Sequence, residues 1–126
     1  MSSASDCLFC RIVAGELPGD VVASTETTVA FRDINPQAPT HVLVVPRRHY
    51  RDTAELATAD PALLGELMAA GVAVAEQEGV AETGYRLLFN TGPHSGQEVF
   101  HVHLHVLGGE PLGAMVGGVV RARGHR

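Results

Sequence analysis

Residues 100–107 read Phe-His-Val-His-Leu-His-Val-Leu, an alternation of histidine with aliphatic residues that constrains the fold more than any other segment. Successive side chains of a β-strand point to opposite faces. The pattern therefore predicts a strand from Phe100 to Leu107 with His101, His103 and His105 on one face. The aliphatic side chains between them need a hydrophobic layer to cover them, so the chain is expected to build a sheet with a buried face.

Turn and capping residues divide the rest of the chain into further short strands and two helices. Four strands are predicted over residues 21–23, 28–31, 41–45 and 85–89, which are rich in β-branched and aromatic residues. Asp60-Pro61 predicts the start of one long helix that ends at Gly79. Ser5 or Asp6 is expected to cap a short helix that runs to Gly15, with Leu8 and Ile12 facing inward and Phe9 as a further candidate. This order predicts an α+β fold: a mainly antiparallel sheet of about five strands, one long helix and a short N-terminal helix.

The length of 126 residues fits a single domain spanning residues 1–126, with flexible ends expected at about 1–5 and 119–126. Hydrophobic residues make up 45% of the chain, which is enough for a folded core. One sheet covered by one long helix still leaves apolar surface to bury. We therefore expect a homodimer.

The formal net charge of −5 argues against a protein that grips DNA or RNA along the backbone. Any phosphate is then held by a few donors in a pocket. No apolar stretch approaches the roughly 18 residues that span a bilayer, and the first residues lack the charged and apolar regions of a secretory signal. We expect a cytoplasmic protein that binds neither nucleic acid nor membrane.

The spacing of the three histidines limits what they can do together. Neighbours on the same strand face are about 6.6 Å apart at the backbone, so the first and third are about 13 Å apart. Two neighbours could share a metal ion, but all three can hardly chelate one. A plain metal site or a solvated strand face are the alternatives, and three consecutive histidines beside a Gly-rich loop favour a catalytic row instead.

Cys7 and Cys10 are the only cysteines and form a Cys-x-x-Cys pair. In a reducing compartment a disulfide is not expected. Metal binding, redox chemistry and ordinary packing all remain open for this pair.

Two segments together resemble the histidine-triad (HIT) family. His101 to Leu107 is similar to its signature His-φ-His-φ-His-φ-φ, in which φ is hydrophobic, and Asp33 to His49 is similar to the upstream half. The likeness runs from Phe9 to Gly109 and is greatest to the Hint branch of nucleoside phosphoramidases. It implies cleavage of purine nucleoside 5′-phosphoramidates, releasing AMP or GMP and an amine.

The resemblance also implies roles for individual residues. His103 matches the nucleophile, which attacks the α-phosphorus while the carbonyl of His101 holds its other ring nitrogen. His105 and His41 match residues that hold phosphate oxygens and assist proton transfer. The remaining phosphate contacts are expected from the Asn90 amide, from Gln97 and from the backbone N–H groups of Glu98 and Val99.

The nucleoside is expected between the histidine strand and the loop at Asp33. Asp33 matches the carboxylate that accepts the ribose hydroxyls, although alone it reads equally well as a turn residue. An apolar slot for the purine base is implied at Leu8, Phe9, Ile12, Phe31 and Ile34, each of which alone is more often ordinary core.

Family members with an N-terminal Cys-x-x-Cys pair it with two histidines around a structural zinc ion. The histidines that match those positions are His49 and His101, since three others have catalytic roles and His94 and His125 lie in a loop and the tail. The expected ligand set is thus Cys7, Cys10, His49 and His101, with no organic cofactor. Two packed cysteines without metal are the rival interpretation.

Two departures from the animal relatives leave the substrate open. Glu98 replaces a hydroxyl residue that can donate a proton to the leaving amine, and the tail after Leu112 lacks their Trp-Pro-Pro-Gly ending. Dinucleoside polyphosphates and acyl-adenylates are alternative substrates. A nucleotide-binding sensor or scaffold with little turnover is the alternative from a different functional class.

Overall fold

The computed structural model describes residues 6–116. The ends predicted to be flexible, 1–5 and 119–126, lie outside this range. Five strands form one antiparallel sheet in the order β1-β2-β3-β5-β4. Their bounds are β1 Val21–Ser24, β2 Thr28–Arg32, β3 Thr40–Pro46, β4 Tyr85–Phe89 and β5 Leu104–Gly108. The predicted α+β class with a five-stranded antiparallel sheet is confirmed.

Three α-helices accompany the sheet in the described range: α1 Leu8–Val13, α2 Thr53–Ala59 and α3 Pro61–Gln77. The long helix α3 starts as predicted, with the Asp60 side chain accepting a hydrogen bond from Leu63 N–H and Pro61 at the first position. α2 was not predicted, because Leu56 is its only large apolar residue and one such residue shows no helical period.

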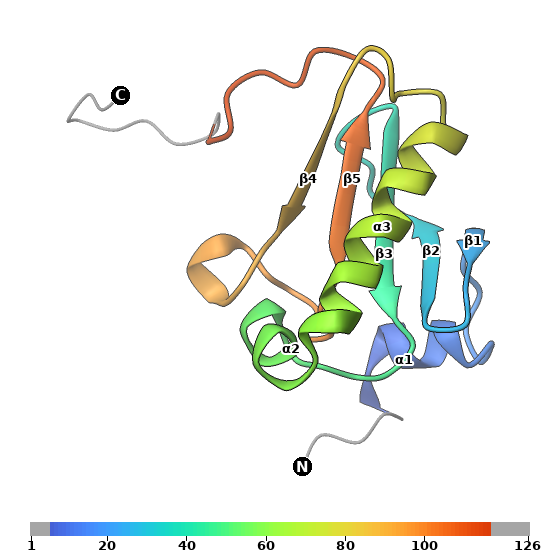
Figure 1. Ribbon diagram of the computed structural model, residues 1–126, viewed down its shortest axis with the longest axis vertical. Helices are drawn as coiled ribbons and strands as arrows, with labels where there is room; N and C mark the ends of the chain where they lie inside the picture. The colour runs from blue at the N-terminus through green and yellow to red at the C-terminus, as the bar shows by residue number, and fades with distance from the viewer. Residues whose placement is uncertain (1–5, 117–126) are drawn as a thin grey trace.

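The face of the sheet covered by α3 carries the larger of two hydrophobic clusters. Figure 1 shows α3 crossing in front of β3 and β5. Gly71 permits this close approach, since a Cβ there would lie 2.6 Å from Leu104 Cδ2. Leu104 and Val106 of β5 pack into this cluster, and so does Val102, which lies just before the strand. The alternation of histidine and aliphatic residues in the sequence predicted this burial.

The opposite face carries the second cluster, which we call the α1 core. It consists of Cys7, Phe9, Cys10, Val29, Phe31, Leu43 and Val45, with Ile12, Val13 and Val99 packed against it. Two details of the predicted helix are wrong. Cys7 is its N-cap, because its Sγ accepts the hydrogen bond from Cys10 N–H, and Leu8 points outward with 46% of its surface exposed, since Phe9 and Cys10 occupy the buried side.

The strand predicted from Phe100 begins only at Leu104. The residues before it bond to the connector between β3 and α2 instead of to a neighbouring strand. Val102 N–H donates to Tyr50 O at 2.8 Å, and the Gln97 side chain donates to Arg51 O in the same connector. The His101 ring donates to Pro46 O, at the end of β3. The alternation of faces persists without the ladder, because His101 and His103 are buried opposite Val102.

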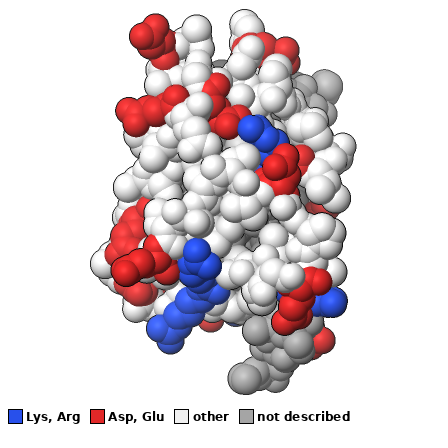
Figure 2. All heavy atoms as spheres, turned by 90° about the vertical axis from the view of Figure 1, so that its right-hand side faces the viewer, with Lys and Arg blue, Asp and Glu red and all other residues white. Residues whose placement is uncertain are grey.

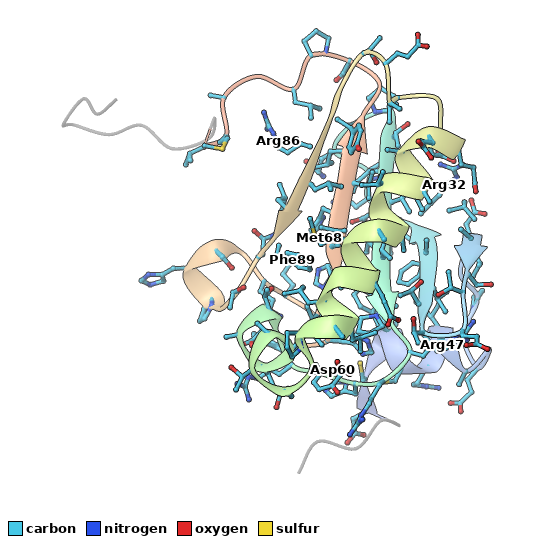
Figure 3. The ribbon with its side chains drawn as sticks, viewed as in Figure 1. Arg32, Arg47, Asp60, Met68, Arg86 and Phe89 are labelled. Atoms are coloured by element: carbon cyan, nitrogen blue, oxygen red, sulfur yellow. The ribbon has the colours of Figure 1, made fainter. Side chains whose placement is uncertain are left out.

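Charged side chains are dispersed over the outside. On the face in Figure 2, acidic residues surround small, separated basic patches. Among the ion pairs of the described range, Arg32 binds Glu78 at 2.7 Å and lies 3.5 Å from Asp20. Arg47 and Arg86 lie at opposite ends of the sheet (Figure 3). No helix within residues 6–116 has the length and apolar character needed to cross a membrane.

Candidate active site

The ring of His103 is oriented by the backbone of its own segment. Its Nδ1 lies 2.8 Å from the carbonyl oxygen of His101. A carbonyl can only accept, so Nδ1 carries the proton and Nε2 of the neutral ring keeps its lone pair. Burial lowers the pKa of His103, which opposes protonation of that lone pair. The arrangement holds a neutral imidazole whose Nε2 keeps a free lone pair.

His41 and His105 form a chain of directed hydrogen bonds, which we call the histidine relay. Gln37 N–H donates to His41 Nδ1 at 3.0 Å, so the proton of neutral His41 is on Nε2. That atom lies 2.9 Å from His105 Nδ1 and can donate to it. His105 then carries its own proton on Nε2. Each ring fixes the tautomer of the next.

The end of the histidine relay is an unused donor. His105 Nε2 is the one buried side-chain nitrogen or oxygen in the described range without a hydrogen-bond partner. Burial, with smaller contributions from His103 and His41, lowers the pKa of His105 to about 4, so the ring is neutral near pH 7. A buried N–H without a partner is costly, and an anionic ligand oxygen would satisfy it. The ring centroids of His103 and His105 are 4.9 Å apart, so one ligand can contact both.

Asn90 comes directly after β4, whose register pairs Phe89 with Leu104. Leu88 pairs with His105, and the alternation of side chains puts Asn90, two residues later, on the same face of the sheet as Leu88. Glu98 is exposed, and Val99 packs against the α1 core. Asn90 thus follows β4 on the face that carries the histidines, while Glu98 and Val99 lie on the loop that leads to His101.

Gln97 is buried and its amide is engaged inside the protein. Its Oε1 accepts from Gly92 N–H at 2.8 Å, and its Nε2 donates to Arg51 O at 3.0 Å and Val99 O at 3.2 Å. Both N–H donors are therefore used. The side chain that was predicted to touch phosphate serves here as a clamp that holds the loop before the histidines.

The residues predicted for the nucleoside fall into two groups. Phe9 and Phe31 are buried and meet edge to face, with ring centroids 5.2 Å apart, and Phe9 meets the ring of His103 in the same way at 5.1 Å. Ile12 packs beside them. By contrast, Leu8 is half exposed and Ile34 is 98% exposed.

Asp33 follows β2 and lies at the edge of the histidine relay. One carboxylate oxygen accepts from Asn35 N–H at 2.8 Å, and the other lies 3.4 Å from His41 Nε2. The carboxylate therefore faces His41 in the row of histidines.

The predicted metal ligands converge on one point. The ligand atoms of Cys7, Cys10, His49 and His101, which we call the Cys–His cluster, all lie within 4.8 Å of one another. His101 Nδ1 is 3.4 Å from both sulfur atoms and 3.2 Å from His49 Nδ1. A tetrahedral site with bonds of about 2.0 Å to nitrogen and 2.3 Å to sulfur separates its ligands by about 3.3–3.8 Å. The spacing fits a zinc ion.

The protons of the Cys–His cluster also fit a cation. His101 Nε2 lies 2.9 Å from Pro46 O and must donate to it, so its Nδ1 lone pair faces the sulfur atoms. Two causes raise the pKa of Cys10 to about 11: burial is the larger, and the neighbouring Cys7 is the smaller. Two converging imidazole nitrogens and two buried thiols form a donor set that a bound cation would satisfy.

A second group, Asp33, His41 and His105, has its ligand atoms equally close but does not fit a metal. His41 Nδ1 already accepts the backbone N–H of Gln37, so Nε2 carries a proton. Binding a metal through Nε2 would require an imidazolate. The Cys–His cluster can therefore bind a metal ion, whereas the group of Asp33, His41 and His105 cannot, although their ligand atoms are equally close.

The comparisons with known proteins agree with this geometry. The HIT domain profile matches residues 14–112. The chain belongs to the HIT family. The purine nucleoside phosphoramidase of Escherichia coli K12 is 44% identical over 113 residues, which cover 90% of this chain and 95% of that protein.

Solved structures of HIT proteins share the fold. A HIT family hydrolase from Legionella pneumophila has a TM-score of 0.80 and 45% identity, covering 85% of this chain and 99% of that one. Another from Clostridium thermocellum has a TM-score of 0.85 and 40% identity, covering 90% and 99%. The three histidines of the family signature are here His101, His103 and His105. The ring of His101 contacts Pro46 O and both cysteines. The ring of His103 is bound to the carbonyl of His101, and that of His105 to His41.

Sequence analysis missed the backbone groups that orient these rings. The His101 ring donates to Pro46 O, and Gln37 N–H donates to the ring of His41. The carbonyls of Tyr50 and Arg51 accept from Val102 N–H and from the Gln97 amide, in the segment that carries the histidines. Backbone groups carry no side-chain signal, so only the fold could identify them. A hollow of about 570 Å³, lined by Thr83–Arg86 and Gly109–Leu112, lies at the other end of β4 and β5.

Proposed function

We propose that this chain hydrolyses purine nucleoside 5′-phosphoramidates or related AMP conjugates through a nucleotidyl intermediate on His103. Hydrolase activity is supported by the similarity to the two HIT family hydrolases, and the substrate by the similarity to the purine nucleoside phosphoramidase of Escherichia coli. The observation that carries the proposal is the hydrogen bond from His103 Nδ1–H to the His101 carbonyl. It leaves one neutral nitrogen free to attack phosphorus.

Substrate binding would use the donors that face the row. His105 Nε2–H is a neutral donor without a partner in the described structure, and a non-bridging phosphate oxygen would satisfy it. Asn90 follows β4 on the face that carries the histidines and can offer its amide to the same phosphate. The Asp33 carboxylate would accept the ribose hydroxyls, and the base would lie against Phe9 and Ile12. A phosphate held by neutral donors suits a chain with a net charge of −5.

The reaction proceeds in two displacements. The lone pair of His103 Nε2 attacks the α-phosphorus, a P–N bond to the ring forms, and the bond to the leaving amine breaks. The amine takes up one proton as it leaves. Water then attacks phosphorus, releases one proton and breaks the bond to Nε2, which yields the nucleoside 5′-monophosphate and restores the neutral ring.

The Cys–His cluster is proposed to hold a structural zinc ion. Its four ligands leave no open position, so the ion would supply rigidity and no reactive group. His101 would be fixed on both sides, by the ion at Nδ1 and by Pro46 O at Nε2. Because the carbonyl of the same residue holds His103, this rigidity would extend to the nucleophile.

We further propose a cytoplasmic homodimer joined along β4. β4 is an edge strand whose five residues are all half-buried, and α3 beside it exposes Met68 and Val72. An unpaired edge flanked by apolar side chains suits pairing with a second copy. Met68→Glu is expected to shift the mass measured by light scattering from dimer to monomer, and a monomeric wild-type protein would contradict the proposal.

His103→Ala tests the enzymatic proposal. Removal of the nucleophile should reduce kcat for an adenosine phosphoramidate by at least about a thousandfold, while AMP still binds because His105 and Asp33 remain. Steady-state kinetics and calorimetric AMP titration measure the two effects. His94→Ala is the matched control, since that exposed histidine lies in the loop at Pro93–Ser95. An unchanged rate in His103→Ala would remove the proposal.

A substrate panel separates the candidate leaving groups. The phosphoramidate, an acyl-adenylate and a dinucleoside tetraphosphate present the same α-phosphorus with different leaving groups. The proposal expects the highest kcat/KM for the phosphoramidate. AMP binding with negligible turnover of all three would instead identify a nucleotide sensor.

A further inference from the structure

The short helix α1 belongs to two sites at once. Cys7 caps it and Cys10 lies in its first turn, and both sulfur atoms are 3.4 Å from His101 Nδ1. Phe9 lies between the two cysteines, and its ring meets the ring of His103 at 5.1 Å. One helical turn therefore carries two ligands of the Cys–His cluster and a side chain against the nucleophile.

α1 cannot hold its own position. It has six residues, whereas isolated helices shorter than about 12 residues are marginal in water. The ion pair that α1 makes in the described range, Arg11 with Glu16, is exposed and joins the helix only to the turn after it. What attaches α1 to the sheet is the packing of the α1 core and the Cys–His cluster.

A second connection passes through His101. Its ring belongs to the Cys–His cluster, while its carbonyl oxygen accepts the Nδ1–H of His103 at 2.8 Å. An ion bound to the ring would restrain the residue that orients the nucleophile. The two connections, Phe9 and His101, start from different elements and end on the same imidazole.

We propose that a metal ion in the Cys–His cluster completes the nucleotide site, so that metal and nucleoside 5′-monophosphate bind cooperatively. The identity of the nucleotide rests on the proposed function. With the ion bound, α1 is anchored and Phe9 is held against His103 as a wall for the base. Without it, α1 loses an anchor and the wall loosens. Coupling of this kind is reciprocal: AMP must raise the affinity for the metal by the factor by which the metal raises the affinity for AMP.

The test is a pair of titrations on the full chain. AMP is titrated calorimetrically into zinc-loaded and chelator-treated protein, and zinc affinity is measured against a chromophoric chelator with and without AMP. We expect AMP to bind about tenfold more weakly without zinc, and zinc to bind tighter by the same factor with AMP. Equal AMP affinity in both forms overturns the coupling alone. Absence of AMP binding to every form overturns the proposed function and the coupling with it.

Phe9→Leu keeps the test decisive if the metal-free chain unfolds. This variant retains all four ligands, so zinc should still bind, but AMP affinity should fall several-fold and the effect of AMP on zinc affinity should shrink to the part carried by the second connection, through His101. Leu63→Ala is the control, because it weakens the core under α3 without touching α1. AMP affinity unchanged in Phe9→Leu, or reduced equally in Leu63→Ala, would overturn the proposal.

Discussion

The Cys–His cluster and the histidine relay each bring two histidine nitrogens within 3.2 Å of each other, yet they differ in where the protons lie. In the Cys–His cluster, a backbone carbonyl takes the outer N–H of His101, so its lone pair points inward. In the histidine relay, a backbone N–H takes the lone pair of His41, so its proton points inward. The first arrangement suits a cation and the second suits an anion. The backbone group bound to one ring nitrogen therefore determines whether the other nitrogen presents a lone pair or a proton to a ligand.

The largest expected effect is the loss of the metal ion from the Cys–His cluster. His49→Ala should reduce bound zinc from about one ion per chain to nearly none, measured by elemental analysis of protein purified without chelator. Free zinc at about a thousand times Kd stabilises a folded protein by about 4 kcal/mol, so the unfolding free energy should fall by a similar amount. His41→Ala, in the histidine relay, should leave the metal content unchanged. Two ions per chain, or equal loss of zinc in both variants, would contradict the distinction.

A smaller effect is expected when the histidine relay is interrupted. His105→Phe removes the donor proposed for the phosphate, and loss of one such donor typically lowers the rate 10²–10³-fold, about 3–4 kcal/mol. His41→Gln should cost less, because His41 acts by orienting His105. Steady-state kinetics on both variants measures the order. A greater loss in His41→Gln than in His105→Phe would show that His41 contacts the substrate itself.

The smallest effect concerns pH. Burial lowers the pKa of His105 to about 4, whereas an unfolded histidine titrates near 6.5. Below pH 6.5 the unfolded chain therefore binds a proton that the folded chain does not, and stability falls as the pH drops from about 6.5 to 4. The slope due to this one group is at most about 1.4 kcal/mol per pH unit. Chemical unfolding across this range should show a shallower decline for His105→Phe than for wild type, and identical slopes would contradict the shift.

Much of the fold could be predicted because its patterns are strongly periodic. The alternation at residues 101–106 placed the histidines and the aliphatic residues on the correct faces, and Asp60-Pro61 marked the start of α3. The start of the last strand could not be predicted, because the hydrogen bonds of residues 97–102 go to the connector after β3. α2 could not be predicted either, because its one large apolar residue, Leu56, shows no helical period.

The candidate site shows the same division. The resemblance to the HIT family placed Cys7, Cys10, His49 and His101 together, and the structure brings them within ligand distance. It could not show that the Gln97 amide is used inside the protein, since that depends on the carbonyls of Arg51 and Val99. Side-chain identities can be read from a sequence, whereas their hydrogen-bond partners are set by how the backbone folds around them.

The central claim is that His103 alone presents a free nitrogen to phosphorus. The most direct measurement is to mix the protein with an adenosine phosphoramidate labelled in the phosphate, quench in base within the first turnover, and map the adduct by mass spectrometry. The account predicts one adenylyl group on His103 and none in His103→Ala. An adduct on His41 or His105, or product formed in the first turnover with no adduct on any histidine, would contradict it.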